Sequence, residues 1–144
     1  LDQLEIKPTD KILEIGTGSG YNACLLATLA FQGQVYSIEI IPELYKFAEQ
    51  NIEKYHCNNI ILYCQDGSLG LKEHAPFDKI IVTAASRTIP QEWVDQLNEP
   101  GILLIPKGEK EIQEMIKIIK TKEGLKEIKL GSFMFVPLKG KYGN

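Results

Sequence analysis

The chain has 144 residues and a formal net charge of −3, and 44% of its residues are hydrophobic and 24% charged. This length suits one domain, and no apolar run reaches the roughly 18 residues that a membrane span needs. Without a long basic run, the sequence lacks the positive face typical of proteins that bind duplex nucleic acid. We therefore expect one domain over 1–144, with neither nucleic acid nor membrane as a partner.

The three cysteines, Cys24, Cys57 and Cys64, are odd in number and form no CxxC pair. Such spacing indicates neither a disulfide framework nor a metal site. We interpret them as reduced packing residues of a cytoplasmic protein and expect no bound metal.

Apolar patterning alternates between short β-like runs and stretches of helical spacing. Strands are predicted, in chain order, at 11–15, 34–40, 59–64, 78–85 and 101–106, and helices at 21–31, 42–55 and 91–97. Pro42 suits the first turn of its helix, where the missing N–H would be unpaired anyway. Strand–helix alternation predicts βαβ units with right-handed crossovers, and therefore an α/β fold with a doubly wound, mostly parallel sheet.

The tail of the chain is ambiguous. Ile112, Met115, Ile116 and Ile119 have helical spacing, which by itself slightly favours a helix over 110–120. However, the "KEG" at 122–124 between two Ile- and Lys-rich runs is a hairpin signal, and "SFMFVPL" at 132–138 is strand-like.

A glycine-rich turn, "GTGSG", follows the first predicted strand and precedes the first predicted helix. Glycines permit positive φ and a close approach of a ligand, and ligands bind at the carboxyl ends of strands in doubly wound sheets. Gly16, Gly18 and Gly20 form GxGxG rather than GxGxxG, with Tyr21 at the expected third glycine, which disfavours a dinucleotide. A tight turn without a ligand is the alternative.

Acidic residues follow the next two predicted strands. Glu39 ends the second strand, where an acid accepts hydrogen bonds from ribose hydroxyls in related folds. Asp66, followed by Gly67, ends the third strand and could accept a hydrogen bond from an exocyclic amine. A glycine turn and two acids at three strand ends are typical of a site that binds a nucleoside and has no phosphate-binding loop. This combination points to S-adenosylmethionine.

Five blocks in the same order resemble the protein-L-isoaspartate O-methyltransferase family: "LEIGTGSGYNACLLA", "VYSIEIIPEL", "DGSLGLKEHAPFDKIIVTAAS", "IPQEWVDQLNEPGILLIPKG" and "FVPLKG". The resemblance covers nearly the whole chain. It implies a class I methyltransferase fold, Rossmann-like, with a seven-stranded, mostly parallel sheet that ends in an antiparallel element. It therefore favours a hairpin and a last strand in the tail.

The same resemblance implies protein repair: methylation of the α-carboxylate of L-isoaspartyl residues in damaged proteins and peptides, with S-adenosyl-L-homocysteine as the cofactor product. The three loop glycines would line the methionine end of the cofactor, Glu39 would hold the ribose, and Ile40, Asp66 and Gly67 would contact the adenine. The positions implied near the substrate are Thr83, Ala84, Ala85, Val136, Pro137 and Leu138.

The implied reaction needs few catalytic groups, because a carboxylate is already ionised at pH 7 and is itself the nucleophile. Accordingly, His56 and His74 are interpreted as a capping or solvent-facing residue and a loop residue, not as an acid and a base. Alignment and desolvation are expected to supply most of the rate.

Residues 1–11 depart from the family pattern. A short Thr/Ser motif that orients the isoaspartyl group has no match there, so no catalytic residue is assigned, and we expect an N-terminally truncated core domain. "LDQLEIKPTD" suggests the end of a helix leading into the first strand. Two alternatives follow: a cofactor-binding module with little catalysis, or a methyltransferase for another substrate. The Asn/Asp-Pro-Pro-Tyr/Phe motif of enzymes that methylate planar amines is absent from "IIVTAAS".

Overall fold

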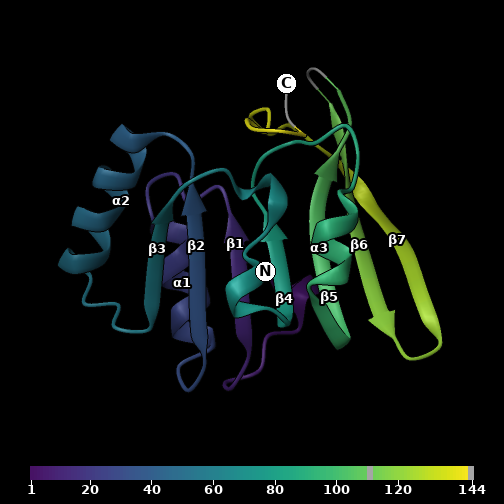
Figure 1. The fold of residues 1–144 in the computed structure, drawn as a ribbon, viewed down its shortest axis with the longest axis horizontal. Coiled ribbons are helices and arrows are strands. Elements are labelled where there is room, and N and C mark those ends of the chain that lie inside the picture. The colour runs from purple at the N-terminus through teal and green to yellow at the C-terminus, as the bar shows by residue number, and fades with distance from the viewer. Residues whose placement is uncertain (110–111, 143–144) are drawn as a thin grey trace.

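The described residues form one seven-stranded sheet. The computed structural model describes residues 1–109 and 112–142, and within them the strand order is β3-β2-β1-β4-β5-β6-β7 (Figure 1). The strands are β1 (Lys11–Ile15), β2 (Gln34–Glu39), β3 (Ile60–Cys64), β4 (Phe77–Val82), β5 (Leu97–Lys107), β6 (Gln113–Thr121) and β7 (Gly124–Phe133). Neighbours from β3 to β5 pair in parallel, whereas β6 pairs antiparallel with β5 and β7. The five strands predicted by patterning are confirmed, although β5 starts four positions earlier than expected.

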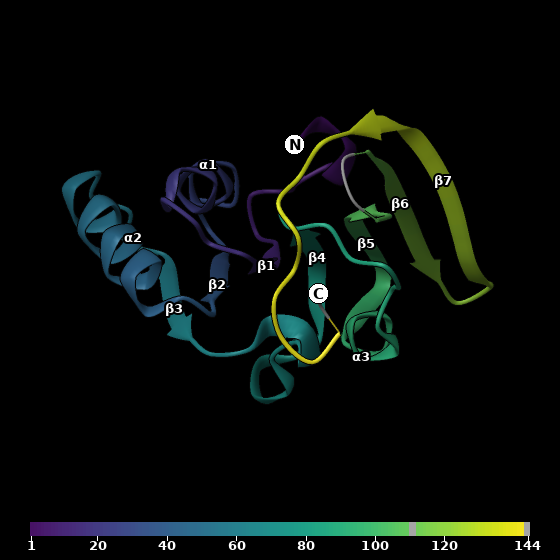
Figure 2. The same cartoon turned by 90° about the horizontal axis from the view of Figure 1, so that it is seen from above.

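Helices lie on both faces of this sheet, as a doubly wound fold requires. They are α1 (Tyr21–Leu29), α2 (Pro42–Lys54) and α3 (Gln91–Asp95), with single 3-10 turns η1 (Asp2–Leu4), η2 (Gly67–Leu69) and η3 (Lys72–His74). Viewed from above, α1 and the N-terminal turn lie on one face and α3 on the other (Figure 2). Residues Asp2–Leu4 form the 3-10 turn η1, at the place where the sequence suggested the end of a helix.

The sheet separates two apolar clusters. Leu13 and Ile15 of β1 pack with the fully buried Trp93 of α3, whereas Ile12 packs with Leu26 of α1 on the opposite face. Successive side chains of a strand point to opposite faces, so a strand covered on both faces is apolar almost throughout. This double burial explains the nearly continuous apolar runs of the parallel strands.

The helix that periodicity slightly favoured over 110–120 is wrong for the residues described there, because 113–121 form β6; residues 110–111 lie outside the described part. Ile116 and Ile118 pack in the cluster of α3, while Met115 and Ile119 pack in the cluster of α1. Apolar side chains on both faces of a strand, with a register shift between Glu114 and Ile116, mimic helical spacing. The hairpin predicted at 122–124 is confirmed, since β6 and β7 are joined there.

The strand-like pattern at 132–138 is confirmed only for its first two residues, because β7 ends at Phe133. Pro137 has no N–H to donate, and Met134 and Val136 are 77% and 70% exposed, so the segment does not continue the ladder. Two antiparallel pairings make β7 run in the direction of β5. The chain therefore returns to the carboxyl ends of the parallel strands.

Candidate functional site

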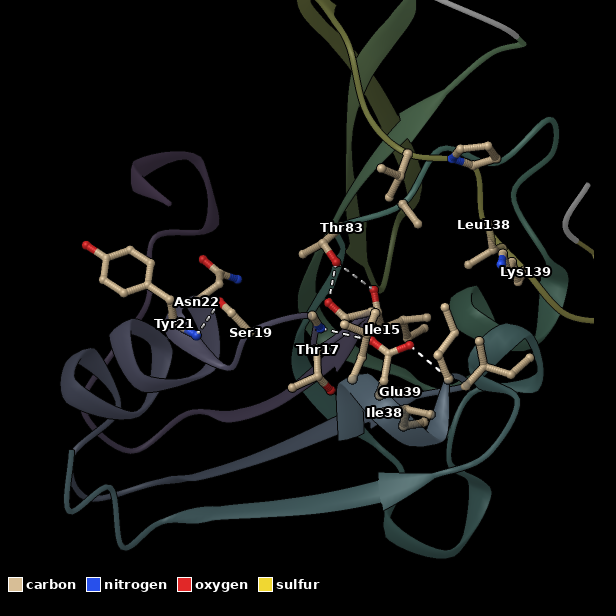
Figure 3. A pocket seen from close by; sticks show the side chains of 18 residues that line it. Ile15, Thr17, Ser19, Tyr21, Asn22, Ile38, Glu39, Thr83, Leu138 and Lys139 are labelled. Carbon is tan, nitrogen blue, oxygen red and sulfur yellow. Dashed lines mark hydrogen bonds between the residues drawn. The ribbon is translucent and has the colours of Figure 1, made fainter. Parts of the chain in front are cut away.

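A cavity of about 540 Å³ lies at the carboxyl ends of β1, β2 and β4 (Figure 3). Its walls come from the glycine turn, residues 38–41, residues 83–84 and the returning segment 136–139. β1 has β2 on one side and β4 on the other, so the cavity sits where the strand order reverses. This is the ligand position of open α/β sheets, and the volume is in the range of small-molecule sites.

The glycine turn is held open by the neighbouring strands. Gly16, Gly18 and Gly20 all have positive φ, from +57° to +97°. The amide of Gly16 donates to the Ile38 carbonyl at 2.9 Å, and the Thr83 hydroxyl donates to the Gly16 carbonyl. A Cβ added to Gly16 would lie 2.5 Å from Thr83 Oγ1, so only glycine fits between the two strand ends. Gly16 and Gly18 line the cavity, whereas Gly20 packs against α2.

Glu39 connects the first two strand ends. Its side chain lines the cavity and is 5% exposed, with Oε2 accepting from the Gly18 amide at 2.9 Å and Oε1 accepting from the Ile41 amide at 3.0 Å. Each carboxylate oxygen can accept a second hydrogen bond. Glu39 therefore fixes the glycine turn and still has acceptor capacity for two hydroxyl groups, with Ile40 beside it in the cavity wall.

A second, fully buried carboxyl lies below the turn. Glu14 accepts from Asn22 Nδ2 at 2.6 Å and from the Ser37 hydroxyl at 2.5 Å, and Ser37 shares a 2.6 Å hydrogen bond with Thr17. Burial raises the pKa of Glu14 to about 7; the bonds from Ser37 and Asn22 oppose the shift, and the charge of Glu39 adds to it. Since Thr17 and Asn22 line the cavity, this network joins the buried acid to its wall.

Asp66 and Gly67 lie beside the cavity but do not line it. Asp66 Oδ1 accepts from the Ser68 amide at 2.9 Å and from the Ser68 hydroxyl, while Oδ2 accepts from the Lys141 amide at 2.8 Å. Partial burial would raise the pKa of Asp66, but these hydrogen bonds outweigh it and lower that pKa. The carbonyl of Gly67 accepts from the indole Nε1 of Trp93 at 3.0 Å.

Residues 83–85 continue from β4 along the cavity. Thr83 and Ala84 line it, whereas Ala85 lies behind and pairs with the returning chain. Its amide donates to the Val136 carbonyl, and its carbonyl accepts from the Leu138 amide, both at 2.7 Å. The wall on this side is completed by Val136, Pro137, Leu138 and Lys139.

Both histidines lie outside the cavity wall. His56 is exposed after α2 with φ of 56°, and His74 stacks on Tyr36 while its Nε2 shares a 2.9 Å hydrogen bond with Tyr63. The three cysteines are free thiols, and burial raises the pKa of Cys24 to about 12. Within the described residues, no helix is both long and apolar enough to cross a membrane.

Comparison with known protein families identifies the family to which a chain with this fold and cavity belongs. The family model of protein-L-isoaspartate(D-aspartate) O-methyltransferase matches residues 1–143. The chain belongs to this family. The sequence-based expectation of that family is therefore confirmed.

Individual members agree with this assignment. The chain is 47% identical over 140 residues to protein-L-isoaspartate O-methyltransferase 1 of Syntrophobacter fumaroxidans, covering 97% of this chain and 64% of that relative. A solved protein-L-isoaspartate O-methyltransferase superposes with a TM-score of 0.92 at 29% identity, covering 99% of this chain and 46% of that one. A Plasmodium falciparum protein described as such an enzyme, in complex with S-adenosyl-L-homocysteine, gives a TM-score of 0.83 at 28% identity, covering 96% and 68%. The chain thus has the class I methyltransferase fold, and it spans 64% of the length of the Syntrophobacter fumaroxidans relative.

Sequence patterns did not reveal the buried network in this member of the isoaspartate methyltransferase family. Glu14 was visible as an acid inside the apolar run "KILEI", and a charge at such a position was the available signal. Its partners Asn22 and Ser37 carried no signal, because they come from a helix and a neighbouring strand. Tyr21, Leu44 and Lys139 in the cavity wall were also missed.

Proposed function

We propose that this protein methylates the α-carboxylate of L-isoaspartyl residues in damaged proteins and peptides, with S-adenosyl-L-methionine as methyl donor. The observation that carries the proposal is the cavity bounded by the glycine turn and Glu39, in a chain of the isoaspartate methyltransferase family. The structure of the Plasmodium falciparum protein in complex with S-adenosyl-L-homocysteine supports the choice of cofactor.

The residues around the cavity fit this cofactor. In our proposal Gly16 and Gly18 face its methionine end, Gly20 supports the turn from behind, and the free acceptor capacity of Glu39 takes the two ribose hydroxyls. The adenine lies between Ile40 and the loop of Asp66 and Gly67. Support comes from the Glu39 carboxylate, which the amides of the turn already orient toward the cavity.

The walls also suit the reaction. When bound, S-adenosylmethionine would supply a methyl group on a sulfonium, an electrophile that an ionised carboxylate can attack without a general base. The chain contributes a largely apolar wall from Thr83, Ala84 and the segment 136–138, which would exclude water beside the reacting carboxylate. Excluding water strengthens the electrostatic interactions inside the site and prevents hydrolysis, while the walls of the cavity align the two reactants.

We propose further that residues 1–144 are one methyltransferase core domain, and that the whole protein includes another segment that covers α1. Tyr21, Leu25 and Leu29 form a stripe on the outer face of α1 and are 64%, 37% and 46% exposed. A helix that is apolar all round is normally buried, and the relatives are longer than this chain. The free thiols support a cytoplasmic location for the protein.

The proposal predicts selective methyl transfer. Label from S-adenosylmethionine should enter an isoaspartyl peptide and not its aspartyl twin of the same sequence, because only the former presents the displaced α-carboxylate. Incorporation is measured by scintillation counting of the separated peptides. Equal labelling of the twins would refute the assigned substrate.

The 144-residue chain alone should turn over weakly or not at all, yet bind S-adenosylhomocysteine, because it lacks a counterpart of the family's Thr/Ser motif. Calorimetry on this chain, beside the peptide assay on a longer chain with the upstream segment, separates the two properties. A folded chain that binds no S-adenosylhomocysteine would contradict the proposed cofactor site.

A further inference from the structure

The segment after β7 is attached at three places: at Ala85 after β4, at Asp66 after β3 and at Glu92 on α3. We define residues 136–142 as the C-terminal strap. Its first anchor is the pair of 2.7 Å hydrogen bonds between the backbones of Ala85 and the strap, and Leu138 is buried to 4% exposure. Residues 136–139 form one wall of the cavity, so the strap and the cavity share residues.

The second anchor is Asp66, which lies 75 positions before Lys141 in the chain. Oδ2 of this carboxylate accepts from the Lys141 amide at 2.8 Å. Gly140 has φ of +116°, and an added Cβ would lie 2.1 Å from Asp66 Oδ1 and 2.7 Å from Ser68 Oγ. The strap therefore reaches Asp66 only because residue 140 has no side chain.

The third anchor is on α3. The Tyr142 hydroxyl donates to Glu92 Oε1 at 2.7 Å, and this hydrogen bond lowers the pKa of Glu92. Neither Tyr142 nor Glu92 lines the cavity wall described above. The end of the strap is thus held at a site separate from the cavity.

Asp66 retains room for one more donor. Of the roughly four acceptor positions of a carboxylate, the amide and hydroxyl of Ser68 use two and the Lys141 amide uses one. An exocyclic amine can therefore bind Asp66 while the strap stays attached. The donors already on Asp66 fix the orientation of its side chain, so a further donor pays less ordering entropy, and by linkage its binding favours the attached strap in turn.

We propose that closure of the C-terminal strap on Asp66 and Glu92 and binding of the cofactor are one coupled equilibrium, with Gly140 and Tyr142 as positioning residues. This inference rests on the proposed function, because it takes the adenine amine as the fourth partner of Asp66. The strap then acts as a wall that is ordered by the ligand and in turn slows its release.

Gly140→Ala tests the coupling directly. The added methyl group should detach the strap from Asp66 and weaken S-adenosylhomocysteine binding roughly tenfold, a typical coupling between two sites. Gly131→Ala is the matched control: φ at Gly131 is +120°, and the added Cβ would meet only a Phe133 ring atom, at 3.9 Å. Calorimetry of both variants and the wild type, with circular dichroism to verify folding, measures the effect. Equal affinity of Gly140→Ala and the wild type would overturn the coupling.

Trypsin provides a readout that a merely structural role would not change. Cleavage after Lys139 and Lys141, followed by mass spectrometry, should slow several-fold when S-adenosylhomocysteine is added. Tyr142→Phe should be cut faster and protected less than the wild type, whereas Tyr45→Phe, which removes a similar tyrosine–Glu49 bond on α2, should behave like the wild type.

The outcomes separate the two proposals. If the wild type binds S-adenosylhomocysteine but either Gly140→Ala keeps the wild-type affinity or the ligand leaves the cleavage rate unchanged, the strap inference is refuted and the proposed function stands. If the wild type binds no S-adenosylhomocysteine, the proposed function fails and the inference fails with it.

Discussion

Replacing Glu39 by alanine is expected to weaken S-adenosylhomocysteine binding about 100-fold, the largest loss at any single position of the proposed site. A hydrogen bond to a charged group contributes about 1.5–3 kcal/mol, so losing the ribose contacts costs on the order of 3 kcal/mol, or about two powers of ten in affinity. The variant also frees the amides of Gly18 and Ile41, which Glu39 now holds at 2.9 and 3.0 Å.

Calorimetry with two companion variants makes this result specific. Glu39→Gln keeps the shape and one oxygen acceptor, so it should lose less affinity than Glu39→Ala. Glu53→Ala removes an exposed carboxylate from α2 and should bind like the wild type. An unchanged affinity of Glu39→Ala would remove Glu39 from the cofactor site.

Glu14→Gln is expected to remove a loss of stability of about 3 kcal/mol that the wild type undergoes as the pH rises. Burial raises the pKa of Glu14 from 4.5 to about 7 in the folded state. Below pH 4.5 the acid is protonated in both states, and its contribution to stability is fully present. Between pH 4.5 and 7 only the unfolded state releases the proton, so stability falls by about 1.4 kcal/mol per pH unit. Glutamine has no such transition.

The difference in the free energy of unfolding between Glu14→Gln and the wild type should therefore be constant at acidic pH. It should then grow in favour of the variant up to pH 8. Urea denaturation followed by circular dichroism at several pH values measures this difference. Glu53→Gln, at an exposed position of α2, should parallel the wild type. A difference between Glu14→Gln and wild type that does not vary with pH would show that Glu14 ionises normally.

Local sequence patterns were sufficient to predict the parallel strands and the helices between them. The run at 11–15 is buried on both faces, and the glycines after it mark the turn into α1, so neighbouring residues alone define the strand, the turn and the helix. Glu39 could be predicted for the same reason, because the end of β2 is visible in the sequence. Its bond to Gly18 connects adjacent strand ends, and its bond to Ile41 is local.

Contacts between distant segments could not be predicted from such patterns. The hairpin signal at 122–124 is the one local indication of β6, because its isoleucines serve two separate apolar clusters and their spacing therefore mimics a helix. Likewise, "DG" at 66–67 indicates a turn, but nothing near it shows that Lys141 donates to Asp66. The direction of β7, which decides where the last residues lie, depends on two earlier pairings.

The only tryptophan of the chain gives the loop of Asp66 an intrinsic fluorophore. Trp93 is fully buried, and its indole N–H is bonded to the carbonyl of Gly67, the residue that follows Asp66. Its emission therefore responds to the hydrogen bond with this loop as well as to the surrounding core, with no second indole to obscure the signal. Binding of the proposed cofactor beside this loop should thus be measurable in real time from the fluorescence of an unmodified, unlabelled chain.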